Sequence, residues 1–198
     1  MTDPLDIALI SAGAAIAGGA LSGAYQHFRD RLERPVLELD HQEAQAYFPT
    51  ANYQTKDGKE VVEIFVRARV RNTGFRVARE CRVFLTNVEE VHHSGTTKTA
   101  FHDSMPLSWP LGDFSARDIP KGVELFVDVV SVFRYPEGWN FKVPQLYSSQ
   151  QGLKTYRGTY RLTLLATAAN ALPSKPLQID ATYQMDWNNF RAVAVPRL

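Results

Sequence analysis

Arginine side chains are the most concentrated group in this chain that could do chemistry. Three of them alternate along residues 60–72 and a fourth lies in the next alternating segment: Arg67, Arg69, Arg71 and Arg82. A guanidinium group carries a rigid fork of N–H donors that suits phosphate and carboxylate oxygens. If the two segments pair as strands, the four side chains predict a contact for an anion or a nucleotide, with Phe65 and Phe84 as a stacking surface. The alternative is that these arginines cover the outer face of a sheet and pair with nearby glutamates.

The remaining polar motifs do not indicate catalysis. Adjacent histidines such as His92 and His93 point to opposite faces of a strand, and no cysteine or carboxylate stands at a zinc-binding spacing. Residues 102–104 read His-Asp-Ser, but consecutive residues cannot adopt the geometry of a hydrolase triad. A glycine-rich phosphate loop and a spaced carboxylate pair are both missing from the sequence. We therefore expect no enzyme, no metal and no cofactor.

Composition limits the classes of partner. The 198 residues carry a formal net charge of +1, which gives no overall attraction to nucleic acid, so we expect no sequence-specific DNA binding. The lone Cys81 excludes an internal disulfide framework. The length suits one globular domain and an accessory element.

Alternation of apolar and polar residues begins at Val36 and predicts strands. The clearest is 60–72, in which one face carries Val62, Ile64, Val66, Ala68 and Val70. Further strands are predicted within 36–40, 79–91, 123–133, 159–170, 177–185 and 187–195. In 123–133 we expect Val123, Leu125, Val127 and Val129 to share a face. Several short alternating strands, separated by turns, predict a two-sheet antiparallel sandwich over residues 35–198. We expect Trp109 and Trp187 to fill its core or to cap its ends.

A long aromatic insertion, YPEGWNFKVPQLYSSQQG, spans residues 135–152. Loops of this length inside a compact domain are usually functional or flexible. Its aromatic side chains predict a partner-binding loop formed by Trp139, Phe141 and Tyr147. The alternative is a loop that packs back on the sandwich.

The N-terminal run 7–25 contains no ionisable side chain before Tyr25. As a helix at about 1.5 Å per residue it would be roughly 28 Å long, close to the thickness of a bilayer core. Small residues recur every four positions and predict one face for helix–helix packing: Ser11, Ala15, Gly19 and Gly23. We therefore expect residues 1–34 to form one long α-helix that spans the membrane and drives homo-oligomerisation. The alternative is a helix buried in a soluble oligomer.

Charges that flank this run indicate its orientation. Asp3 and Asp6 precede it, and three arginines follow it, which is the reverse of a cleaved secretory signal. The positive-inside rule then predicts a single-pass protein of the bacterial inner membrane whose C-terminal domain is cytoplasmic.

Residues 62–89, VEIFVRARVRNTGFRVARECRVFLTNVE, resemble the paired strands of bacterial immunoglobulin-like domains. In those domains an alternating strand ends in an Asn-x-Gly turn and the next strand begins with an Ala-x-x-Cys-type sequence. The resemblance implies an immunoglobulin-like sandwich for residues 35–198 and implies no chemistry. With the N-terminal helix, the arrangement is similar to small antiphage membrane effectors.

Two functions are expected from this arrangement. In the first, the sandwich senses a nucleotide or protein ligand and controls clustering of the helices, which perturb or perforate the bilayer in antiviral defence. In the second, the chain is a membrane-tethered scaffold, a binding module that recruits a protein partner.

Overall fold

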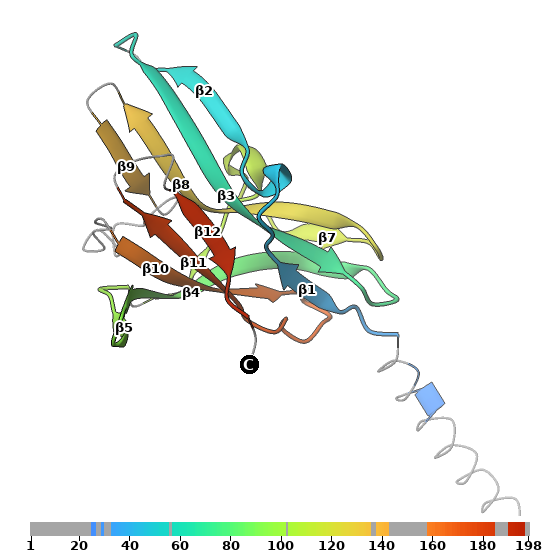
Figure 1. Ribbon diagram of the computed structural model, residues 1–198. Coiled ribbons are helices and arrows are strands. Elements are labelled where there is room, and N and C mark those ends of the chain that lie inside the picture. Colours follow the sequence, from blue (N-terminus) through green and yellow to red (C-terminus); the bar gives the residue numbers. More distant parts are fainter. Residues whose placement is uncertain are drawn as a thin grey trace, which may run out of the picture. The chain divides into compact units, whose positions relative to one another are not determined.

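The chain is mainly β, with two antiparallel sheets (Figure 1). The computed structural model describes residues 25–26, 29, 33–55, 57–101, 103–135, 138–142, 158–184 and 190–196. The chain divides between Arg34 and Pro35, and every assigned strand belongs to the unit Pro35–Leu198.

The first sheet has five strands among the described residues, and β3 lies at its centre. The order along the sheet is β1 (Leu37–Asp40), β3 (Glu60–Asn72), β8 (Glu124–Tyr135) and β9 (Gly138–Lys142). β2 (Thr50–Gln54) pairs with the N-terminal half of β3, and β1 pairs with its C-terminal half. The 3-10 turn η1 (Gln45–Tyr47) connects these two short strands.

The second sheet has seven strands among the described residues, with β4 near its centre. The order is β12 (Arg191–Ala194), β11 (Leu177–Tyr183), β10 (Gly158–Thr167), β4 (Ala78–His92) and β5 (Gly95–Lys98). β6 (Met105–Pro106) and β7 (Arg117–Ile119) also pair with β4, and the turn η2 (Pro110–Gly112) lies between them. Although β3 and β4 are consecutive in the chain, they belong to different sheets.

Apolar side chains of both sheets form one hydrophobic core. β3 contributes alternate residues such as Val66 and Val70, whereas β10 contributes Leu162 and Leu164. Trp109, which is 2% exposed, belongs to the same core, which is one of the two positions predicted for it. Because each strand alternates, the apolar faces of the two sheets pack together and the polar faces remain outside.

The turn after β3 is held by a buried asparagine side chain. The Asn72 amide oxygen accepts hydrogen bonds from the backbone N–H groups of Val36, at 3.2 Å, and Gly74, at 3.0 Å. Its nitrogen donates to the carbonyl oxygens of Arg76, at 2.7 Å, and Ile119, at 2.9 Å. One side chain therefore binds four backbone groups, which belong to the segment before β1, the turn after β3, and β7.

β8 departs from the predicted alternation at one residue. Val66 is opposite Val130, but the next residue, Arg67, is opposite Asp128, so Val129 is an extra residue in the ladder. Such a bulge resets which side chains face outward. Of the residues predicted to share one face, Val127 and Val129 are buried in the core and Leu125 packs against it, whereas Val123 is exposed. Beyond the bulge the buried residues of β8 are Val130 and Val132.

The predicted fold class is corrected at the N-terminus. The two sheets are present, but among the described residues there is no long α-helix to precede them. The predicted packing residues, Ser11, Ala15, Gly19 and Gly23, lie outside the described residues.

A search of the described residues finds no helix with the length and apolar character needed to cross a bilayer. The predictions of a transmembrane helix and of a single-pass inner-membrane protein are corrected accordingly. They relied on the length of an uncharged run, whereas alanine, glycine and serine side chains supply little apolar area to bury in lipid.

Candidate functional site

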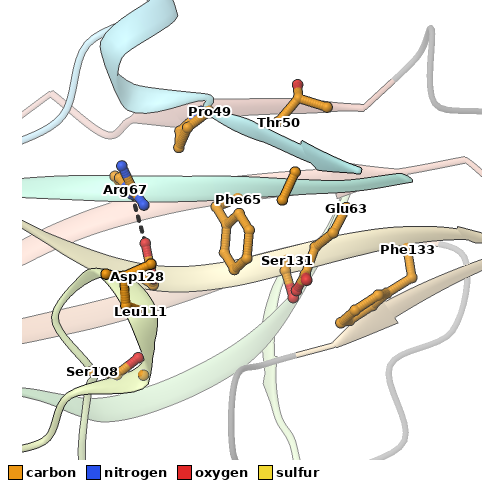
Figure 2. Close-up of a pocket in the computed structure, with 12 residues that line it drawn as sticks. Pro49, Thr50, Glu63, Phe65, Arg67, Ser108, Leu111, Asp128, Ser131 and Phe133 are labelled. Atoms are coloured by element: carbon orange, nitrogen blue, oxygen red, sulfur yellow. Dashed lines mark hydrogen bonds and ion pairs between the residues drawn. The ribbon is translucent and has the colours of Figure 1, made fainter. Parts of the chain in front are cut away.

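A pocket of about 410 Å³ opens on the outer face of the first sheet (Figure 2). Its volume falls in the range of about 300–1,000 Å³ that is usual for ligand sites. The lining residues come from β2, β3, β8 and the segment around η2: Pro49, Thr50, Ala51, Glu63, Phe65, Arg67, Ser108, Leu111, Gly112, Asp128, Ser131 and Phe133. Figure 2 shows Pro49 and Thr50 on one side of β3, with Ser108 and Leu111 on the other.

Three cross-strand pairs form the floor of this pocket. Along β3 and β8, Glu63 is opposite Phe133, Phe65 is opposite Ser131, and Arg67 is opposite Asp128. Directly opposite residues of antiparallel strands place their side chains on the same face, close enough to interact. The bulge at Val129 aligns the last pair, because a continuous register would place Val129 opposite Arg67.

Arg67 and Asp128 form an ion pair at the base of the pocket. Arg67 Nε donates to Asp128 Oδ1 at 2.6 Å, and the two side chains are 20% and 5% exposed. Burial raises the pKa of Asp128 from its usual value, although the hydrogen bond and charge of Arg67 act in the opposite direction. Among the described residues, Asp128 is the side-chain partner of this guanidinium, through Nε alone. Nη1 and Nη2 therefore remain as donors for a ligand.

The segment around η2 forms one wall and is held in place by several hydrogen bonds. The Asp128 backbone N–H donates to Ser108 O at 2.9 Å, which ties this wall to β8. The indole Nε1 of Trp109 donates to Ser115 O at 2.8 Å. Asp113 accepts hydrogen bonds from Arg117 and Ser115, which lower its pKa to about 2.

Leu111 at the rim is unusual in both conformation and exposure. Its φ of 71° and ψ of 19° lie in the left-handed region, and its side chain is fully exposed. The left-handed conformation costs a residue with a Cβ roughly 1–2 kcal/mol. Because the side chain is exposed, its burial does not offset this cost.

The other predicted arginines are already in ion pairs or lie elsewhere. Arg69 pairs with Asp40 and with Glu124, the latter at 2.9 Å, whereas Arg71 lies 3.7 Å from Glu124. The β3 arginines thus lie in one row, with three carboxylates around them. Arg82 is on β4 in the other sheet, where its Nη1 donates to Phe114 O at 3.1 Å. The structure therefore groups Arg67 with its β3 neighbours and separates Arg82 from them.

The predicted aromatic loop is partly a strand. The backbones of Trp139 and Phe141 lie in β9, opposite Arg134 and Val132 of β8. Tyr147 lies outside the described residues.

The histidine-rich segment is described only in part. His92 lies 3.8 Å from Glu90, and His102 lies outside the described residues. The ranges that are described contain no group of three metal-binding side chains.

Comparison with known proteins leaves the site to be interpreted from its own geometry. The chain matches no protein-family model, and no curated protein matches it in sequence.

The sequence did not predict Asp128, Ser131 and Leu111 as pocket residues. One signal was visible: Asp128 lies between Val127 and Val129 within VELFVDVVSVF, where an unpaired carboxylate would be costly to bury.

Proposed function

We propose that the unit Pro35–Leu198 is a non-catalytic recognition module that binds an uncharged, apolar segment of a protein partner in the pocket. The observation that carries this proposal is the buried Arg67–Asp128 pair beneath aromatic walls. The proposal keeps the partner recruitment predicted from the sequence and omits the membrane tether.

The charges of the pocket favour a neutral ligand. Among the lining residues one cation, Arg67, is accompanied by two carboxylates, Glu63 and Asp128. A phosphate or carboxylate ligand would gain one guanidinium but would also approach both of these carboxylates. A peptide carbonyl oxygen can accept from Arg67 Nη1 or Nη2 without that repulsion. The anion or nucleotide contact predicted from the arginines is therefore the less favourable occupant of this pocket.

Apolar side chains supply the remaining contact area. Phe65 projects from β3 next to the ion pair, and Phe133 lies farther along β8 (Figure 2). Leu111 lies at the rim formed by η2, across β3 from Pro49 and Thr50. Aromatic anchors of this kind dominate the affinity of protein interfaces when a partner excludes water from them. An aliphatic or aromatic side chain of the partner, flanked by its own peptide groups, matches both the walls and the free donors of Arg67.

The proposal is tested by selecting a library of short random peptides against the full chain and measuring the affinity of the tightest binder by fluorescence polarisation. We expect a consensus with one large apolar residue and no acidic residue next to it. Leu111→Ala and Phe65→Ala are each expected to weaken binding by about tenfold or more, because each removes an apolar wall.

Matched controls distinguish pocket contacts from general surface effects. Leu172→Ala and Phe75→Ala remove exposed apolar side chains of the same two types that do not line the pocket, and they should leave the affinity unchanged. Thermal melts verify that each variant is folded. Recovery of no binder, or of binders equally insensitive to all four substitutions, would contradict the proposed function.

A further inference from the structure

The strand β2 lies at an edge of the first sheet (Figure 1). Among the described strands it pairs only with β3, and four of its five residues are exposed. Its first residues, Thr50 and Ala51, also line the pocket, so the edge and the pocket are continuous.

The pattern of backbone hydrogen bonds between β2 and β3 shows which backbone groups of β2 point away from the sheet. The Phe65 N–H donates to Pro49 O at 3.0 Å, and the Thr55 N–H donates to Lys59 O at 2.9 Å. In an antiparallel ladder, bonded and non-bonded positions alternate. With these two pairs bonded, Ala51 and Tyr53 also turn their backbone groups toward β3. The N–H and C=O groups of Thr50, Asn52 and Gln54 therefore point away from the sheet.

This edge lacks the features that normally block pairing with another strand. Between Thr50 and Gln54 the sequence has no charged residue and no proline. Its register with β3 is continuous, without a bulge. Edge strands that must stay unpaired usually carry one of these three features.

We infer that the outward edge of β2 accepts the partner segment as an added strand; this inference rests on the proposed function and specifies how the ligand lies. Added strands gain affinity from backbone hydrogen bonds and specificity from alternate side chains. Ala51 and its β3 neighbour Glu63 are directly opposite and both line the pocket, so Ala51 is on the pocket face. The ligand residue opposite Ala51 then has its side chain on the same face. The small Ala51 methyl group leaves room for that side chain to reach over β2 toward Phe65.

The test compares two substitutions at the centre of the edge, with the tightest library peptide as the probe. Asn52→Pro removes an outward N–H that does not bond to β3, whereas Asn52→Val keeps this N–H and changes only the side chain. We expect Asn52→Pro to weaken binding by at least about tenfold and Asn52→Val to weaken it less than about twofold.

Amide hydrogen exchange of the full chain supplies an independent measurement. Adding the peptide should slow exchange at Thr50, Asn52 and Gln54 by at least about tenfold, because their N–H groups become hydrogen-bonded. Exchange at Ala51 and Tyr53 should change much less, since these amides already face β3. This alternation is specific to an added strand and would not arise from general shielding of the surface.

Failure of this inference is distinguishable from failure of the proposed function. If Phe65→Ala weakens binding but Asn52→Pro does not, the pocket binds the peptide and the edge inference is overturned. If Asn52→Pro weakens binding but the pocket substitutions do not, the edge inference stands and the proposed pocket function fails. If the three outward amides are already protected without peptide, and Asn52→Pro converts a dimer into a monomer, a second copy occupies the edge and the inference is overturned.

Discussion

Replacing Arg67 by methionine would remove the cation that pairs, among the described residues, with a nearly buried carboxylate. The Asp128 side chain is 5% exposed and lies 2.6 Å from Arg67 Nε. Breaking a buried pair by deleting one partner typically costs about 3–5 kcal/mol. Arg67 is itself 20% exposed, so water can partly replace it, and we expect the lower limit of this range, about 3 kcal/mol. In a chain of this length that loss lowers Tm by roughly 6–12 °C.

The free energy of unfolding that is lost in Arg67→Met should also depend on pH. Burial raises the pKa of Asp128 in the folded protein above its unfolded value, so its contribution to stability is greatest at low pH and disappears as the pH rises through the folded value. Without the opposing charge of Arg67 this pKa rises further. Urea denaturation should therefore show a larger loss at neutral pH than at acidic pH, because protonation of Asp128 removes the unpaired charge.

Two comparison variants make this prediction specific. Arg71 forms a half-exposed pair with Glu124 at 3.7 Å, so Arg71→Met should cost less than about 1 kcal/mol. The double substitution Arg67→Met with Asp128→Leu removes both charges and should recover most of the lost stability. The reasoning is refuted if Arg67→Met costs no more than Arg71→Met, or if its cost is the same at both pH values.

Three further substitutions or reactions test other parts of the fold. Leu111→Gly should raise the free energy of unfolding by about 0.5–1 kcal/mol, because it relieves the left-handed strain without losing buried area; a destabilised variant in urea titration would contradict this. Asn72→Ala should lower stability by about 3 kcal/mol or more, since four backbone groups lose their partner; calorimetry showing a smaller loss would argue against that role. Burial raises the pKa of Cys81 to about 11, so a disulfide-exchange reagent should label this thiol only after unfolding.

Much of the strand arrangement was predictable because it follows from local alternation. The run EVVEIFVRARVRN was predicted as a strand and is β3, and its alternate residues Val66, Ala68 and Val70 are buried. The segment 159–170 was likewise predicted as a strand, and Leu162 and Leu164 of β10 face the core. A strand with this pattern can bury its apolar side chains only by turning one face inward, so residues a few positions apart contain the necessary information.

The candidate site was less predictable because its parts are far apart in the sequence. Arg67 and Asp128 are 61 residues apart and meet through the pairing of β3 with β8. The bulge at Val129 belongs to that pairing, and no local property of VELFVDVVSVF specifies where it occurs. The grouping of Arg67 with Arg82 failed for the same reason, since adjacent alternating segments entered different sheets.

The amino-acid sequence by itself determined which segments become strands and which of their faces are apolar, because these properties depend on the chemistry of near neighbours. Tertiary structure alone decided that Arg67 is matched with Asp128, that Leu111 is exposed at a rim, and that β2 pairs with β3 alone among the described strands. Each of these depends on strand register and sheet order. Those are settled by the packing of distant segments into one core, which the pattern of any single segment does not contain.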